Sequence, residues 1–208
     1  MTLPNKLTIL RIVMIPVMIL IWYIPWFDNT MIFEITDKGE NGFFYGLSAF
    51  GLFEVIIFIL ASVTDFFDGY IARKKNLVTS FGKFLDPLAD KMLVFTAMII
   101  LMLDFKSFGT WYWNLMPLWA LVIMLVREFS VSGIRMLVAS KGVVMPAAFL
   151  GKFKTFTTMI AIIFLFFAHT SMVVAIIGMV LMYIACLFTI LSGVEYFWKS
   201  RNVILESI

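Results

Sequence analysis

The sequence predicts an all-α integral membrane protein in which six transmembrane helices follow a short amphipathic N-terminal segment. Of its 208 residues, 62% are hydrophobic and only 14% are charged, and the mean hydropathy is +1.03. These values lie outside the range of soluble globular domains. Six apolar stretches follow one another, with no internal repeat, low-complexity segment or soluble domain boundary between them. We therefore expect a single membrane-embedded domain over residues 1–208.

The first span is expected at about residues 7–26, where it ends in aromatic side chains typical of a membrane interface. No small-x-small cleavage site follows, so this span should be retained rather than removed as a signal peptide. Asn5, Thr8 and Arg11 recur at every third position and form a polar stripe that enters the membrane. The stripe either belongs to a site or extends to the lipid headgroups.

The second and third spans are expected at about residues 43–71 and 83–103, after an acidic loop over residues 28–41. The second span is longer than a bilayer requires, so its last turns should project into the interface. Glu54 lies deep in its apolar run, where we expect a hydrogen bond to a neighbouring helix. Pro87 would fall in the first turn of the third span, where its missing N–H costs little.

The last three spans carry charges that a bilayer tolerates only if they point inward. The fourth span opens with an aromatic belt at residues 111–113 and stays apolar until Arg127 and Glu128, the fifth begins near Gly151, and the sixth covers about residues 171–197. Glu128 and Arg135 lie almost in line on a helix, so they could form a structural ion pair. Alternatively, these charges line a water-filled cavity.

Four aspartates lie beside apolar segments between residues 65 and 90. On a helix that advances about 100° per residue, the first two share a face with two small residues and an arginine. This face consists of Asp65, Asp68, Gly69, Ala72 and Arg73. The next helix repeats the arrangement at intervals of four residues with Gly82, Asp86 and Asp90. Two acidic faces joined by a short basic link can converge.

A divalent metal ion is the physical reason for such a set of carboxylates. Clustered carboxylates near an apolar phase are costly unless a cation neutralises them, and hard oxygen ligands suit Mg²⁺ or Mn²⁺. Metals held in this way commonly bind phosphates, small residues let a nucleotide approach the backbone, and Arg73 would contact a phosphate. Thr79 lies in the link, near the expected nucleotide side. The alternative is an interfacial acid cluster paired with nearby lysines, namely Lys74, Lys75, Lys83 and Lys91.

The acidic segment resembles the signature of the CDP-alcohol phosphotransferases, D-x₂-D-G-x₂-A-R-x₈-G-x₃-D-x₃-D, and departs from it at no fixed position. Three further strings resemble the branch of that family that uses glycerol phosphate, the bacterial phosphatidylglycerophosphate synthases. These are PNKLTILR at residues 4–11, REFSVSGIR at residues 127–135 and GKFKT at residues 151–155. The resemblance covers nearly the whole chain.

The resemblance implies a membrane-embedded catalytic domain with the family's fold, which transfers a phosphatidyl group from CDP-diacylglycerol to sn-glycerol 3-phosphate and releases CMP. Divalent metal would be held by Asp65, Asp68, Asp86 and Asp90, and Asp90 would also accept the proton of the acceptor hydroxyl. It implies membrane lipids and a homodimer as partners, and no nucleic acid. The residues expected to bind CDP-diacylglycerol are Asn5, Thr8, Gly69, Ala72, Arg73, Thr79 and Gly82.

The acceptor phosphate is expected to bind a set of cations on the inner halves or ends of two consecutive spans: Arg127, Arg135, Lys141 and Lys152. Lys152 and Lys154 point to opposite sides of a helix, so only one of them should face the site. Two alternatives stay open. The acceptor could instead be inositol phosphate, serine or a second phosphatidylglycerol, and a cation channel or transporter could also place carboxylates in a membrane.

The charge distribution predicts the orientation. Six spans place both termini on the same side. If that side is the inner one, only Lys38 and Lys106 fall on outer segments, and the other 14 of the 16 lysines and arginines fall at inner ends or inner halves of spans. The positive-inside rule then favours a multi-pass protein of the plasma membrane whose termini and active site are cytoplasmic. The cytoplasm is also where nucleotide substrates occur.

Overall fold

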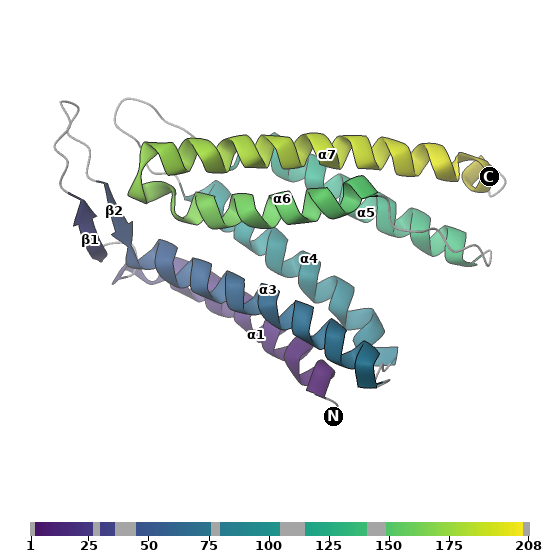
Figure 1. Ribbon diagram of the computed structural model, residues 1–208, viewed down its shortest axis with the longest axis horizontal. Coiled ribbons are helices and arrows are strands. Elements are labelled where there is room, and N and C mark those ends of the chain that lie inside the picture. Colours follow the sequence, from purple (N-terminus) through teal and green to yellow (C-terminus); the bar gives the residue numbers. More distant parts are fainter. Residues whose placement is uncertain are drawn as a thin grey trace.

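The computed structural model describes the backbone of residues 3–26, 30–35, 45–75, 80–104, 115–140 and 149–205 (Figure 1). Side chains within residues 65–84 lie outside the described part. Six long helices lie in the described ranges: α1 (Leu3–Tyr23), α3 (Ala49–Lys75), α4 (Ser80–Leu103), α5 (Leu118–Ser140), α6 (Phe149–Phe166) and α7 (Met172–Leu205). A 3₁₀ turn, η1 (Ala168–Thr170), joins α6 to α7. The helical class predicted from composition is confirmed.

A short β-hairpin precedes α3, where the sequence predicts an acidic loop and then helix from residue 43. Strands β1 (Met31–Ile35) and β2 (Tyr45–Ser48) pair antiparallel, with Ile35 opposite Tyr45. Antiparallel pairing with β1 keeps residues 45–48 extended, so the start of the expected helix forms β2 and α3 begins at Ala49. The expected helical start of the second span is therefore wrong.

The helices form two groups of three. In the first group α1 packs along α3 and α4, and in the second α7 packs along α5 and α6 (Figure 1). A continuous apolar core runs through both groups, with Met18, Phe58 and Leu165 among its fully buried members. At Gly51, α3 comes very close to the end of α6. A Cβ atom there would lie 2.4 Å from the backbone oxygen of Phe166, so only glycine allows α3 to approach α6 this closely.

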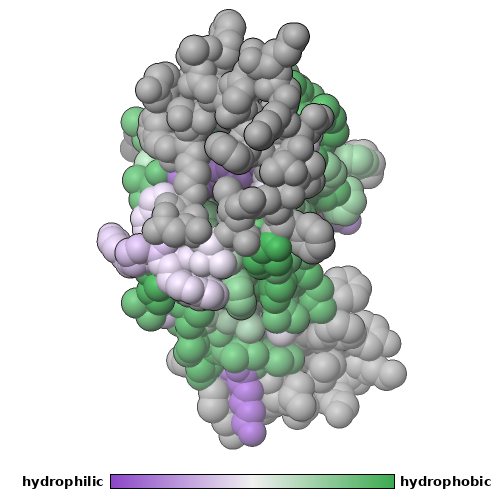
Figure 2. All heavy atoms as spheres, turned by 90° about the vertical axis from the view of Figure 1, so that its left-hand side faces the viewer, coloured by the Kyte–Doolittle hydropathy of each residue, from purple (hydrophilic) through white to green (hydrophobic). Residues whose placement is uncertain are grey.

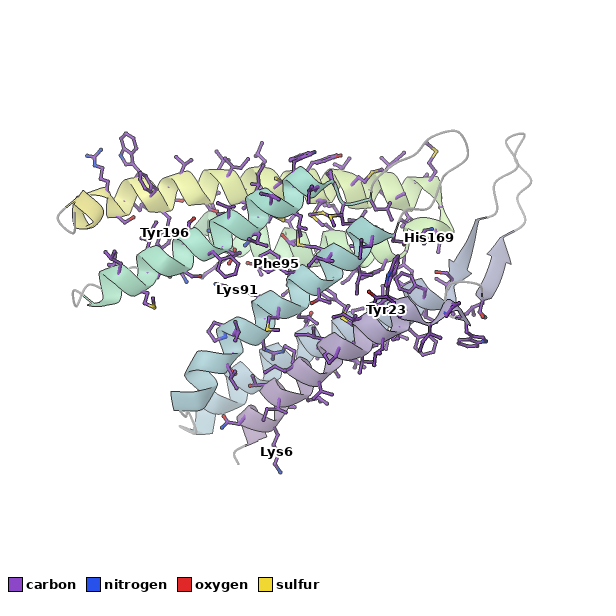
Figure 3. All side chains as sticks on the ribbon, turned by 180° about the vertical axis from the view of Figure 1, so that it is seen from behind. Lys6, Tyr23, Lys91, Phe95, His169 and Tyr196 are labelled. Carbon is purple, nitrogen blue, oxygen red and sulfur yellow. The ribbon has the colours of Figure 1, made fainter. Side chains whose placement is uncertain are left out.

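A buried polar contact fastens the end of α4 to the α6–α7 connection. Nε2 of His169 in η1 lies 2.8 Å from Oδ2 of Asp104, and the two side chains are only 11% and 3% exposed. Asp104 directly follows α4, so the contact joins the two helix groups at the end that carries the hairpin, where Figure 3 shows His169. Asp104 therefore provides a carboxylate partner for His169.

The surface is that of a membrane protein. Large apolar side chains are exposed on every long helix, including Leu20 of α1, Phe129 of α5 and Val173 of α7, and they cover much of the described surface in Figure 2. Soluble monomers rarely expose contiguous apolar patches of this kind. Within the residues that the structure describes, two helices can cross a membrane by length and composition, Asn5–Tyr23 and Met172–Arg201, and the apolar part of α3, Ala49–Thr64, is shorter. Six transmembrane helices therefore stay a prediction.

Two expectations about helix interiors differ from the structure. Because α4 begins at Ser80 rather than residue 83, Pro87 lies two turns inside the helix and not in its first turn. Its ring nitrogen cannot donate to the carbonyl of residue 83, which loses its usual partner within the helix. Glu54 is fully buried, yet neither of its oxygens has a hydrogen-bond partner among the described residues, so the expected bond to a neighbouring helix is not found.

Candidate active site

A cavity lies between the two helix groups, where α4 faces α5 and α6. Its volume is about 60 Å³. Among the described residues, four charged side chains line it together with apolar residues and two threonines: Asp90, Lys91, Glu128 and Lys154. Figure 3 shows Lys91 and Phe95 of α4 in the space between α4 and α5. Charges gathered in an apolar protein indicate a functional site rather than packing.

The polar stripe of α1 faces the site and does not extend to headgroups. Thr8 is 1% exposed, and its Oγ1 donates a hydrogen bond to Oδ1 of Asp86 at 2.5 Å. Arg11 is fully buried and donates from Nε to the carbonyl of Ala61 at 3.3 Å, just before the acidic end of α3. The alternative of a lipid-facing stripe is therefore wrong for both side chains. Helix α1 instead holds one of the four predicted metal ligands.

Asp86 and Asp90 lie one turn apart on α4, and both are half-buried. Asp90 lines the cavity, whereas Asp86 faces α1 through Thr8. The other predicted residues of the acidic segment fall outside the described side chains: Asp65, Asp68, Gly69, Ala72, Arg73, Thr79 and Gly82. The convergence of the two acidic faces therefore stays a prediction.

Glu128 lies at the centre of a cluster of cations. Its Oε1 accepts hydrogen bonds from Nη1 of Arg127, at 2.9 Å, and from Nζ of Lys154. Its Oε2 lies 3.8 Å from Nζ of Lys91. The three cations come from three different helices, α5, α6 and α4. We call Glu128 and these three cations the Glu128 cluster.

The alternative of a structural ion pair between Glu128 and Arg135 is wrong. Arg135 donates from Nε to the hydroxyl of Tyr196 at 2.9 Å, and its guanidinium carbon lies 5.2 Å from the centre of that ring. Arg127 is the neighbour of Glu128 in the sequence, and α6 brings Lys154 close to it. Both lie nearer to Glu128 than Arg135, which is two turns away. Arg135 thus joins α5 to α7 and, within the described part, does not line the cavity.

The structure corrects the choice of acceptor cations. Lys152 is exposed on α6, whereas Lys154 is buried and lines the cavity with Asp90, so the side of α6 that faces the site is the side of Lys154. Arg127 lies behind Glu128, where it lines a groove between α5 and α7 instead. Lys141 lies outside the described residues. Lys154 and Lys91 are therefore the cations that the structure brings to Asp90.

Comparisons with known proteins agree with the acidic signature. The model of the CDP-alcohol phosphatidyltransferase family matches residues 1–191. The chain belongs to this family. Three relatives illustrate the similarity, and all are named CDP-diacylglycerol–glycerol-3-phosphate 3-phosphatidyltransferase. That of Bacillus subtilis is 40% identical and the alignment covers 99% of this chain and 98% of the relative. That of Rickettsia typhi is 41% identical over 94% of each, and that of Salmonella choleraesuis is 30% identical over 98% and 97%.

A CDP-alcohol phosphatidyltransferase is expected to use a divalent metal ion, and the donors present fit one chemically. Asp86 and Asp90 offer hard carboxylate oxygens one turn apart. Among the described residues, no three metal-binding side chains gather at one point, but Asp65 and Asp68 are not among the side chains described. The metal site of this phosphatidyltransferase therefore stays a prediction from its signature.

Sequence reasoning missed two cavity residues of the phosphatidyltransferase. Lys91 was considered only as a partner of the acids, and Lys154 was passed over in favour of Lys152. One signal was available for the second: Lys154 lies four residues before Thr158, and both are buried on α6. Polar residues spaced by four on an otherwise apolar helix mark the face that points inward.

Proposed function

We propose that the protein is a CDP-diacylglycerol–glycerol-3-phosphate 3-phosphatidyltransferase, which makes phosphatidylglycerol phosphate and CMP. The observation that carries the proposal is the similarity over nearly the full length to relatives of that name. This chain also has every fixed residue of the signature within residues 65–90. Membership in a transferase family argues against the channel or transporter alternative.

In the proposed reaction, the acceptor hydroxyl attacks the phosphorus that carries diacylglycerol, and the bond from that phosphorus to CMP breaks. Asp90 takes the hydroxyl proton, because it lines the cavity beside the cations that would hold the acceptor. Lys154 and Lys91 would bind the acceptor's phosphate through charge-assisted hydrogen bonds. The residues proposed to bind CDP-diacylglycerol stay Asn5, Thr8, Gly69, Ala72, Arg73, Thr79 and Gly82.

The acids that would hold the metal are Asp65, Asp68, Asp86 and Asp90, with Mg²⁺ or Mn²⁺ as the proposed ion. The metal would lower the charge barrier at the pyrophosphate and stabilise the departing CMP. Thr8 supports this set from α1, since its hydroxyl donates to one oxygen of Asp86 and fixes the orientation of the carboxylate. A homodimer remains a proposal that rests on the family resemblance.

A panel of acceptors tests the proposed function. Purified protein, CDP-diacylglycerol and Mg²⁺ or Mn²⁺ are incubated with glycerol 3-phosphate, glycerol, inositol phosphate, serine or phosphatidylglycerol, and the lipid products are identified by mass. We expect phosphatidylglycerol phosphate and CMP with glycerol 3-phosphate, and little product with the others. A product formed only from another acceptor would move the protein to a different branch of the family. Equal use of free glycerol would remove the case for a phosphate pocket.

We further propose that both termini and the active site face the cytoplasm of a multi-pass plasma-membrane protein. The start of α1 and the end of α7 lie toward the same end of the molecule, opposite the hairpin (Figure 1), as an even number of crossings requires. Lys6 lies at this end and Ile32 lies in the hairpin (Figure 3 labels Lys6), and both are exposed.

Cysteine labelling in whole cells tests this orientation. The native Cys186 is buried, and Cys186→Ala removes it as background. We expect Ile32→Cys to react with a thiol reagent that does not cross the membrane, and Lys6→Cys to react only with one that does. The opposite pattern would invert the topology. Labelling of both positions from outside would contradict a membrane crossing by α1, the helix that separates them.

A further inference from the structure

The Glu128 cluster is held by contacts on the side away from the cavity as well as on the cavity side. Arg127, which pairs with Glu128 through Nη1, donates through Nη2 to Oγ of Ser192 on α7 at 2.9 Å. Two glycines border the path of its side chain. A Cβ atom on Gly193 would lie 3.2 Å from Cγ of Arg127, and one on Gly151 would lie 3.6 Å from Nη2. Arg127 thus lies between α6 and α7 and contacts Glu128 from the side away from the cavity.

The cavity side of the cluster is also fixed. Lys91 donates to Oγ of Ser132, whose hydroxyl in turn donates to the backbone oxygen of Glu128 at 2.7 Å. The side chain of Lys154 is 11% exposed, and Glu128 accepts its hydrogen bond. The carboxylate of Glu128 therefore sets the distances between cations from α4, α5 and α6. A buried ammonium or guanidinium group without such a partner is costly.

The charges of the cluster suit a phosphate monoester. One carboxylate and three cations carry a net charge of +2, and a phosphate monoester carries about −1.5 to −2 at neutral pH. Without the carboxylate, three cations would repel one another in a partly buried space. Glu128 therefore keeps the cations together before the anion arrives, which lowers the cost of ordering them on binding.

We propose that Glu128 is a positioning residue for the acceptor's phosphate: it holds Lys91 and Lys154 in place at the cavity and is itself held by Arg127, which Ser192 anchors in turn. The inference rests on the proposed function for the identity of the acceptor. It assigns Arg127 a different task from the direct phosphate contact that the sequence predicts. Arg127 acts through Glu128, because Glu128 and not Arg127 lines the cavity with Asp90.

A competing role predicts the opposite sign. If Glu128 merely occupied the phosphate's place, its removal would free Lys154 and improve acceptor binding. The anchoring of Arg127 between two helices argues against this. A carboxylate that moved aside when the phosphate bound would not need a buried arginine to hold it from the side away from the cavity. The Michaelis constant for glycerol 3-phosphate separates the two roles.

The test compares Glu128→Gln with the unchanged protein. We expect the Michaelis constant for glycerol 3-phosphate to rise about 10- to 100-fold, and that for CDP-diacylglycerol to change less than about 2-fold. Glu128→Asp keeps the charge and should recover part of the loss. An unchanged or lower constant for glycerol 3-phosphate, or an equal rise of both constants, would overturn the proposal.

A milder pair of variants guards against misfolding of Glu128→Gln. Ser192→Ala removes only the hydroxyl that binds Arg127, and Thr189→Ala removes a buried hydroxyl one turn earlier on α7 that bonds to its own helix. We expect Ser192→Ala to raise the constant for glycerol 3-phosphate about 2- to 5-fold and Thr189→Ala to leave it unchanged. The effects of Ser192→Ala and Glu128→Gln should not add, because both act through the same carboxylate. Equal effects of the two α7 variants would contradict this chain of contacts.

Binding without turnover separates this inference from the proposed function. Calorimetric titration of the protein with glycerol 3-phosphate, and separately with inorganic phosphate, needs no CDP-diacylglycerol. If the unchanged protein makes no phosphatidylglycerol phosphate, the proposed function fails, while weaker phosphate binding by Glu128→Gln still supports the positioning role. If it makes the product and Glu128→Gln binds phosphate equally well, only the positioning role fails.

Discussion

Replacing Asp90 with Asn should lower turnover by about 10³-fold or more while the protein stays folded. The variant keeps the shape of the side chain but removes both a proton acceptor and a metal-ligand charge, and each of these contributes on the order of 10²-fold or more. Asp90 lines the cavity together with Lys91 and Lys154, so its carboxylate lies where the acceptor hydroxyl is proposed to react. Release of CMP from CDP-diacylglycerol in the presence of glycerol 3-phosphate measures the loss.

Asp86→Asn should also be severely impaired, because Asp86 is a proposed ligand that α1 holds through Thr8. The matched control is Glu195→Gln on α7, which neutralises a carboxylate whose partner is the exposed Lys199. That variant should retain near-normal turnover. EDTA should abolish activity of the unchanged protein, and Mg²⁺ or Mn²⁺ should restore it. Full activity in EDTA, or an Asp90→Asn variant with half of the normal turnover, would refute the metal-dependent reaction.

Lys154→Met should lower kcat/KM for glycerol 3-phosphate by about 30- to 100-fold, mainly through the Michaelis constant. A hydrogen bond to a charged group contributes about 1.5–3 kcal/mol, a range that includes this factor. Methionine retains most of the length and apolar stem of lysine, so the packing of α6 should change little. Initial rates at varied concentrations of each substrate give the two constants separately.

Lys152→Met is the control for this prediction, since the two lysines lie two residues apart on the same helix and differ mainly in the direction they face. Lys152 is exposed, and its loss should leave both Michaelis constants nearly unchanged. If Lys152→Met were the impaired variant and Lys154→Met were normal, the sequence-based choice of Lys152 would be right and the orientation of α6 in the structure would be wrong for the active state.

The sequence could predict those parts of the site that depend only on the spacing of residues within one helix. Asp86 and Asp90 share a face because four residues make about one turn, and the stripe of Thr8 and Arg11 follows from a period of three to four. The structure confirms that this stripe faces inward. The side chains of Asp65 and Asp68, predicted in the same way, stay predictions.

The expectations that were wrong depended on contacts between two different segments of the chain. Glu128 pairs with Arg127, Lys154 and Lys91 instead of Arg135, because α4 and α6 bring two of these partners from elsewhere in the chain. The strand β2 replaced a helical start because pairing with β1 decided its conformation. A periodic pattern within one segment does not indicate which other segment packs against it, so it could predict neither of these contacts.

The sequence by itself determined that this is a membrane protein of the CDP-alcohol phosphatidyltransferase family, because hydropathy and a signature of fixed residues are properties of short stretches of chain. It also determined which acids share a helix face. Only the tertiary structure decided that Lys154 and not Lys152 faces Asp90, that Thr8 supports Asp86, and that Glu128 joins three helices. These contacts depend on the rotation and axial position of each helix relative to its neighbours, which packing of the whole core sets.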